Sequence, residues 1–212
     1  MKSFRRYYLD KCLKQYSYLI KGKVLDVGGK KIDKRGGFDI SLLDAEVTYL
    51  NNDRATKPDI HSDAKSIPIG DNYFDTVIST ELLEYVPNPC DVLEEIYRVS
   101  KKNSNIILSI PFLHPIHGDF WQDRYRLTAL QIQNLCNDIG FEVNVILPMG
   151  SVGAVFFDIL KVSFGYGGKS KLKSFYLLIL RFFRVFFVIL DRISKHQSKF
   201  INTGYFIILK KV

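Results

Sequence analysis

The stretch that decides the fold is Val24-Leu25-Asp26-Val27-Gly28-Gly29, an apolar run that ends in an acid and two glycines. Such a run is typical of a parallel β-strand that is buried on both faces. Two glycines at its carboxyl end let the backbone turn sharply and approach a bound molecule without a Cβ in the way. Because ligands of open α/β sheets bind at this end of the strands, the stretch predicts a ligand site there.

Outside this stretch, predicted strands alternate with predicted helices. Further strands are expected at residues 47–50, 74–80, 105–110, 141–147 and 204–209. Asn88 before Pro89 is a helix start, and Thr128 with Gln131 resembles a capping box. Apolar residues at helical spacing predict an amphipathic helix over residues 3–20. The alternation predicts a Rossmann-like, mostly parallel α/β sheet.

Length and composition suit one compact domain with an appendage. The chain has 212 residues, 47% of them hydrophobic, which is enough for a sizeable core. Cys12, Cys90 and Cys136 are few, odd in number and far apart, so they fit neither a disulfide framework nor a metal site. The basic N-terminus lacks the apolar segment of a secretory signal. We therefore expect a cytoplasmic protein.

Charge is distributed unevenly along the chain. Residues 1–23 hold seven Lys or Arg against one Asp, and residues 161–195 hold eight against one. Residues 24–160 hold twelve Lys or Arg against twenty Asp or Glu, so the body is acidic and the flanks are basic. A nucleic-acid enzyme more often carries its basic surface around the active site. The pattern argues against a nucleic-acid partner and favours an anionic membrane surface at the flanks.

Acidic and polar side chains follow several predicted strands. Asp53 comes after the second strand, where a carboxylate can accept hydrogen bonds from ribose hydroxyls. Asp63-Ala64 lies in the next loop, where a carboxylate could accept from an adenine amino group. Thr80-Glu81 ends the strand that begins at Phe74. Taken singly each acid reads as a cap or a solvated loop residue, but together they favour a ligand that contains a nucleoside.

These motifs resemble the class I S-adenosylmethionine-dependent methyltransferases, in the type 11 group. The matching stretches are residues 24–29, 62–68, 71–75, 79–84, 95–99 and 204–210. The resemblance implies a seven-stranded sheet with an antiparallel seventh strand, and S-adenosylmethionine as cofactor. It places the donor on Asp26, Gly28, Gly29, Asp53, Asp63, Ala64, Thr80 and Glu81. Two departures are Lys30-Lys31-Ile32, where the family has further glycines, and Tyr85, where many members have His.

Two other classes of protein compete with this interpretation. A nicotinamide-dependent reductase also needs a glycine-rich first turn, but residues 28–31 lack the GxGxxG spacing that seats a pyrophosphate. The Asp63-Ala64 element does not belong to that pattern either. A non-catalytic binding protein on a degenerate methyltransferase fold is the second competitor, because glycines are missing at Lys30 and Ile32.

The segment 111–126 is expected to bind the methyl acceptor, because it follows the strand at 105–110. His117 is the predicted general base and Asp119 the residue that orients it. The other predicted acceptor contacts are His114, Trp121, Asp123, Arg124 and Arg126, with the two arginines on a carboxylate or phosphate. The segment resembles that of a methyltransferase subgroup linked to cell-surface polysaccharide and glycolipid synthesis. This implies O- or N-methylation of a sugar or lipid-linked saccharide, with a small soluble metabolite as the alternative; no metal site is expected.

A helical, basic insertion is expected over residues 149–202, and residues 1–148 with 203–212 form the methyltransferase domain. Residues 173–195 predict one cationic amphipathic helix with Lys173, Arg181, Arg184, Arg192 and Lys195 on one face. Its apolar part, residues 175–190, is too short and too charged for a membrane span. We expect it to lie at the inner face of the membrane, the alternatives being packing on the domain or a homodimer contact.

Overall fold

The computed structural model describes the chain except residues 35, 117–121 and 164–170, and the side chains of 171–173. Its strands are β1 (Gly22–Val27), β2 (Ala45–Asn51), β3 (Ile60–His61), β4 (Phe74–Thr80), β5 (Ser100–Pro111), β6 (Phe141–Pro148) and β7 (Gly204–Lys211). Its α-helices are α1 (Phe4–Gln15), α2 (Pro89–Val99), α3 (Ala129–Ile139), α4 (Val152–Ser163), α5 (Lys171–Phe182) and α6 (Arg184–Ile193). Short 3-10 helices are η1 (Ser17–Leu19), η2 (Ile40–Leu42), η3 (Arg54–Thr56) and η4 (Lys195–Lys199).

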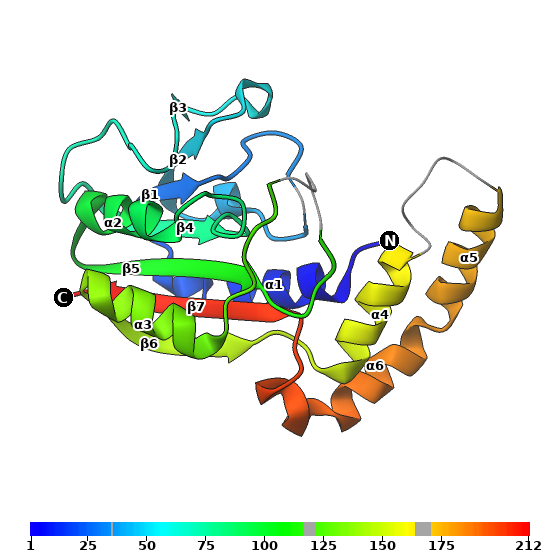
Figure 1. Cartoon of the computed structure of the whole chain (residues 1–212). Coiled ribbons are helices and arrows are strands. Elements are labelled where there is room, and N and C mark those ends of the chain that lie inside the picture. Colours follow the sequence, from blue (N-terminus) through cyan, green and yellow to red (C-terminus); the bar gives the residue numbers. More distant parts are fainter. Residues whose placement is uncertain (35, 117–121, 164–170) are drawn as a thin grey trace.

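The strands form one seven-stranded sheet in the order β3-β2-β1-β4-β5-β7-β6 (Figure 1). The pairs from β3 to β5 are parallel, and β7 lies antiparallel between β5 and β6. The predicted Rossmann-like sheet and its antiparallel last strand are therefore confirmed. The two-residue strand β3 was not expected, because Ile60 and His61 are too short a run to show periodicity.

Two apolar layers cover the sheet because successive strand residues point to opposite faces. Leu25 packs in the cluster with α2 and α3, whereas its neighbour Val24 packs in the cluster with Leu9 and Leu13 of α1. The predicted helix signals are confirmed as well. Asn88 caps α2, Thr128 and Gln131 form a capping box at α3, and Gly140 ends α3 at a φ of 107°.

The helices α4 to α6 lie between β6 and β7 and pack beside α1 (Figure 1). The predicted single helix over 173–195 is wrong, because the chain breaks at Phe183 into α5 and α6. The break lets each helix pack separately. The backbone of α6 meets α4 at Gly153, where an added Cβ would lie 2.4 Å from the carbonyl oxygen of Phe187. Tyr176 and Leu180 of α5 belong to the same apolar cluster as Phe157 of α4, and the Tyr176 hydroxyl donates to the carbonyl oxygen of Leu160 at 3.1 Å.

Arg184 does not belong to an outward basic face. Its guanidinium lies 5.1 Å from the ring centroid of Phe4 and 5.5 Å from that of Phe157. It also donates a hydrogen bond to the carbonyl oxygen of Lys2 at 3.3 Å. Arg184 therefore fastens α6 to the N-terminal helix. Within the described ranges, no helix combines the length and the apolar character needed to cross a bilayer.

Candidate functional site

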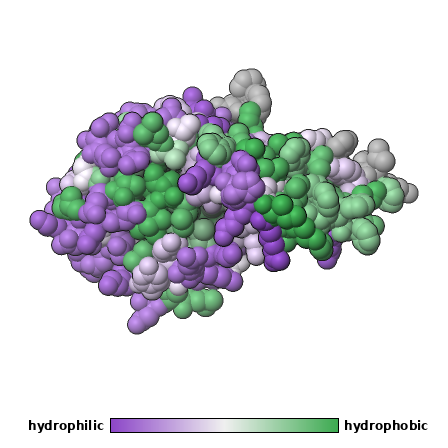
Figure 2. All heavy atoms as spheres, turned by 90° about the horizontal axis from the view of Figure 1, so that it is seen from below, coloured by the Kyte–Doolittle hydropathy of each residue, from purple (hydrophilic) through white to green (hydrophobic). Residues whose placement is uncertain are grey.

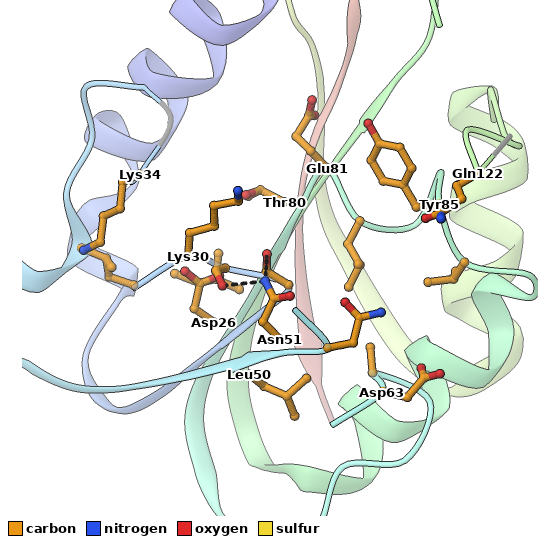
Figure 3. Close-up of a pocket in the computed structure, with 18 of the residues that line it drawn as sticks. Asp26, Lys30, Lys34, Leu50, Asn51, Asp63, Thr80, Glu81, Tyr85 and Gln122 are labelled. Carbon is orange, nitrogen blue, oxygen red and sulfur yellow. Dashed lines mark hydrogen bonds between the residues drawn. The ribbon is translucent and has the colours of Figure 1, made fainter. Parts of the chain in front are cut away.

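A cavity of about 620 Å³ lies at the carboxyl ends of β1, β2 and β4 (Figure 3). Its lining brings together residues that were predicted from separate parts of the sequence. These are Asp26, Gly28, Gly29, Asp63, Ala64, Thr80, Glu81 and Arg124. The volume suits a ligand of nucleoside size or larger. This end of the sheet is where the opening glycine stretch predicted a ligand.

The turn after β1 has room for glycine alone at two positions. Gly28 has a φ of +79°, and an added Cβ would lie 3.0 Å from Leu82. An added Cβ at Gly29 would lie 2.1 Å from the carboxyl carbon of Asp26. The amide Nδ2 of Asn51 donates to the carbonyl oxygens of both glycines, at 3.0 and 2.9 Å. The turn is thus held against β2, and its bare backbone borders the cavity.

Asp26 places a carboxyl group in the cavity wall beneath this turn (Figure 3). It accepts no hydrogen bond from any other described residue. Burial raises the pKa of Asp26 from 3.8 to about 7, and the charge of Lys34 opposes this shift. The carboxyl group therefore changes its charge near neutral pH, and it does so in the wall of the cavity.

The acid predicted to bind ribose lies elsewhere. Asp53 caps η3 by accepting a hydrogen bond from the backbone N–H of Ala55 at 2.9 Å, and it does not line the cavity. The side chains at that wall belong to Asn51 and Asn52. The sequence could not separate these three consecutive polar residues, because the strand ends one residue later than expected. Asp63 and Ala64 do line the cavity, and their role in binding the donor stays a prediction.

Glu81 holds an uncommon backbone conformation at the end of β4. Its φ of 58° lies in the left-handed region, which costs energy in a residue with a side chain. Its backbone N–H donates to the carbonyl oxygen of Ser109 at 3.0 Å, and its carboxylate accepts from the Ser109 hydroxyl at 2.9 Å. The same carboxylate pairs with buried Arg5 of α1. These contacts fix Thr80 and Glu81 at the cavity.

The helix α1 closes one side of the cavity with Arg6, Asp10 and Leu13. The Asp10 carboxylate accepts a hydrogen bond from the backbone N–H of Gly37 at 2.7 Å, which ties the loop after β1 to the helix. Sequence reasoning missed this role of α1. Apolar periodicity predicts a helix, but it does not say where the polar face docks.

Lys30 stands where the resemblance expected a further glycine, and it lines the cavity. Lys34, farther along the same loop, lines the cavity as well. Lys34 donates to Asp39 at 2.6 Å and to the Tyr49 hydroxyl at 2.9 Å. Lys30 makes no hydrogen bond or ion pair with a described residue, and Figure 3 shows it extending from the region of Asp26 toward Thr80. Its ammonium group is available to an anionic part of a ligand.

The predicted acceptor residues divide into two groups. Arg124 lines the cavity with Gln122, and its backbone N–H donates to the carbonyl oxygen of Glu84 at 2.7 Å. Arg126 instead pairs with Asp123, at 2.6 Å between Nη2 and Oδ2, and donates to the His114 carbonyl oxygen at 3.3 Å. Asp123 and Arg126 therefore stabilise the segment itself rather than lining the cavity.

His114 is buried away from the cavity. Its Nδ1 lies 3.5 Å from a carboxylate oxygen of Asp158 on α4, and burial lowers the pKa of His114. The remaining predicted acceptor residues, His117, Asp119 and Trp121, lie outside the described residues. Across the described ranges, no cluster of three or more His, Cys, Asp or Glu side chains could hold a metal ion.

Comparison with known protein families agrees with this geometry. Residues 31–108, which run from the loop after β1 into β5, match the family model described as "Methyltransferase domain". This match identifies a methyltransferase domain within the chain. The matched region includes Asp63, Ala64, Thr80 and Glu81, and it begins just after the glycine turn.

A curated relative shares part of its sequence with this chain, and solved structures share its fold. A chloroplast 2-methyl-6-phytyl-1,4-hydroquinone methyltransferase from Spinacia oleracea is 29% identical over 117 residues, which cover 48% of this chain and 32% of that protein. A geranyl diphosphate C-methyltransferase from Streptomyces coelicolor superposes with a TM-score of 0.59 at 11% identity, over 97% of this chain and 80% of that one. The [4+2]-cyclase SpnF does so with a TM-score of 0.57 at 19% identity, over 96% and 79%. Since a cyclase shares the fold, the fold alone does not set the reaction.

The residues of the cavity fit S-adenosylmethionine as the methyl donor. The glycine turn leaves an open cradle beside Asp26. A Cβ at Gly29 would collide with the Asp26 carboxyl group and close this space. The donor carries a positive sulfonium and an ammonium group, which suits the carboxyl group of Asp26. Its carboxylate suits the ammonium group of Lys30, and its adenosine suits Asn52 and Asp63 as hydrogen-bonding partners.

Proposed function

We propose that the protein transfers the methyl group of S-adenosylmethionine to an oxygen or nitrogen of an acceptor that carries a carboxylate or phosphate. A sugar or a lipid-linked saccharide of cell-surface polysaccharide synthesis is the acceptor class that the sequence favours. The observation that supports methyl transfer is the shared cavity. It joins the donor cradle at Gly28 to Gln122 and Arg124 of the acceptor segment. Figure 3 shows Gln122 on the other side of the cavity from Lys34.

On the donor side, the chain supplies binding and orientation. Bound S-adenosylmethionine supplies an electrophilic methyl group, and transfer then requires mainly an in-line approach of the acceptor. Gly28 and Gly29 let the backbone come close, while Asn51 keeps the turn in place. Arg5 and Ser109 hold Glu81 beside Thr80, so this wall of the cavity is fixed before a ligand binds.

On the acceptor side, Arg124 is the arginine that can bind an anionic group. Arg124 lines the cavity and its side chain pairs with no described carboxylate, whereas Arg126 is paired with Asp123. A planar guanidinium suits a carboxylate or phosphate better than an ammonium group does. We retain His117 as the general base, with Asp119 orienting it, because a hydroxyl acceptor must lose its proton.

Donor binding tests the proposed function most directly. We expect calorimetric titration to show binding of S-adenosylmethionine and its demethylated product, but not of NADH. We also expect the affinity for the cationic donor to rise with pH between about 6 and 8, because the Asp26 carboxyl group ionises across its pKa of about 7. The Asp26→Asn variant should lose this dependence on pH.

Two contrary results would redirect the assignment. Binding of NADH in place of the methyl donor would favour the reductase. Absence of binding for every nucleotide would favour a non-catalytic protein on this fold. Lys30 in the glycine turn is the residue that motivates this alternative. If the acceptor were a small soluble metabolite, the donor-binding results would not change. Screening candidate acceptors with labelled S-adenosylmethionine distinguishes a soluble metabolite from a lipid-linked saccharide by which of them receives the label.

Steady-state kinetics should separate Arg124 from His117. We expect Arg124→Ala to raise KM for an anionic acceptor by about tenfold or more with little change in kcat, since one charged hydrogen bond is lost. His117→Ala should instead lower kcat by about a hundredfold, and the loss should shrink as pH rises. Lys102→Ala, at an exposed position outside the cavity lining, is the control. An unchanged KM in Arg124→Ala would remove that residue from acceptor binding.

A further inference from the structure

Two apolar stripes face solvent on the helical insertion. On α5 the exposed large apolar residues are Phe175, Leu178, Ile179 and Phe182, and on α6 they are Val185, Phe186, Ile189 and Ile193. Both sets follow helical spacing, so each forms one continuous face. Phe182 is 81% exposed and Ile193 is 70% exposed. Figure 2 shows hydrophobic residues, in green, gathered at this end of the molecule.

The opposite faces of the same helices are already packed on the protein. Tyr176 and Leu180 of α5 lie in one apolar cluster with Phe157, and the Phe187 ring of α6 lies 5.5 Å from the Phe157 ring in an edge contact. The helices α5 and α6 are therefore apolar on both sides, and packing on the domain explains only one side. A helix that is apolar all round normally has an apolar partner on each face.

Cationic side chains accompany the exposed stripes. Arg181, Arg192, Lys195 and Lys199 are exposed. Asp191, the one acid of residues 171–202, is buried, and its carboxylate accepts hydrogen bonds from the backbone N–H groups of Ser151 and Ala154. The solvent-facing side of α5, α6 and η4 therefore combines apolar side chains with positive charge and no exposed acid.

We propose that this face of α5, α6 and η4, termed the insertion face, docks on an anionic lipid membrane. Apolar side chains would enter the acyl boundary while the arginines and lysines meet the headgroups. A second copy of the chain is a poorer occupant, because a symmetric contact would bring two sets of positive charges together. The insertion face replaces the single helix expected from the sequence, and Arg184 is no part of it.

The insertion leaves and rejoins the sheet at the end that carries the cavity. The insertion begins after Pro148, which pairs with Tyr205, and Gly204 pairs with Pro111 at the carboxyl end of β5. Docking would thus bring the end of the sheet that carries the site toward the membrane. Access to a lipid-linked acceptor rests on the proposed function, whereas docking itself does not require methyl transfer.

Vesicle co-sedimentation tests the insertion face with the full chain. We expect wild-type protein to bind phosphatidylcholine vesicles that contain phosphatidylglycerol, and to bind pure phosphatidylcholine weakly. Binding should weaken with salt but not vanish, because apolar burial is not screened. Phe182→Ser/Phe186→Ser should lower the affinity at least about tenfold, as should Arg181→Glu/Lys195→Glu. Phe187 is left unchanged because it packs on Phe157.

Matched variants control for exposure and charge. Leu42→Ser/Leu130→Ser removes two exposed leucines elsewhere, and Lys14→Glu/Lys102→Glu reverses two exposed charges elsewhere. Both should bind vesicles as the wild type does. The proposal would be overturned if the wild-type protein did not bind anionic vesicles. It would also be overturned if the wild type sedimented as a dimer and only the Phe182→Ser/Phe186→Ser variant sedimented as a monomer. Titration with S-adenosylmethionine reports separately on each variant, so failed donor binding with intact vesicle binding would overturn the proposed function alone.

Discussion

Replacing Gly29 with alanine is expected to lower the affinity for S-adenosylmethionine about a hundredfold. Forcing an extra carbon into a packed site costs about 1–3 kcal/mol, and a hundredfold loss lies near the upper end of that range. The added Cβ would lie 2.1 Å from both the carboxyl carbon and Oδ2 of Asp26. Asp26 lies on β1, between β2 and β4, so its backbone cannot retreat. Either the Asp26 side chain must rotate, or the turn must move and break the hydrogen bond from Asn51 to the Gly29 carbonyl oxygen. Both changes alter the donor cradle.

Gly70→Ala is the matched control for this prediction. Gly70 lies in the loop before β4, and an added Cβ there meets no atom within 4 Å. We expect donor affinity and thermal unfolding of this variant to match the wild type, as measured by calorimetry and circular dichroism. If Gly29→Ala bound the donor as tightly as wild type while remaining folded, the turn after β1 would not be the donor cradle.

The sheet could be predicted from the sequence because its strands are strongly marked. Residues 74–80 and 105–110 are apolar enough to be buried on both faces, and they occupy the centre of the observed sheet. Capping signals located α2 and α3 for the same reason, since each is satisfied by neighbours in sequence. These features depend on local residues and so can be recognised without tertiary contacts.

Contacts between distant segments could not be predicted. Asn51 supports the glycine turn from a neighbouring strand, and Arg5 reaches Glu81 across the molecule. An asparagine or arginine shows no periodicity that would indicate such a partner. His114 looked like an acceptor residue for a related reason: its position after β5 is set by sequence, but its orientation toward Asp158 is set by the packing of α4.

The break at Phe183 is a similar case. Residues 173–195 read as one helix, because Phe183 has no property that ends a helix by itself. The break exists because α6 must approach α4 closely at Gly153 while α5 packs on Phe157. The apolar character of the segment was visible in the sequence, but the division into packed and exposed faces came from the tertiary structure.

Asp158 fastens the insertion to the N-terminal helix, and its removal is expected to give the largest loss of stability. This fully buried carboxylate on α4 accepts hydrogen bonds from the backbone N–H groups of Phe4, at 2.7 Å, and Arg5, at 2.9 Å. These are the first N–H groups of α1, which have no partner within the helix. A carboxylate at this end also meets the positive end of the helix dipole.

We expect Asp158→Ala to lower the free energy of unfolding by about 3–5 kcal/mol, because two buried donors lose their acceptor and Arg5 loses a nearby negative charge. Urea denaturation measures this as a lower midpoint at unchanged slope. Asp158→Asn keeps one acceptor oxygen and should lose less. Asp138→Ala, which removes an exposed carboxylate from α3, should change stability by about 0.5 kcal/mol or less. Since Arg5 also holds Glu81 at the cavity, the alanine variant should bind S-adenosylmethionine more weakly even where it remains folded. A variant as stable as wild type would show that α4 does not anchor α1.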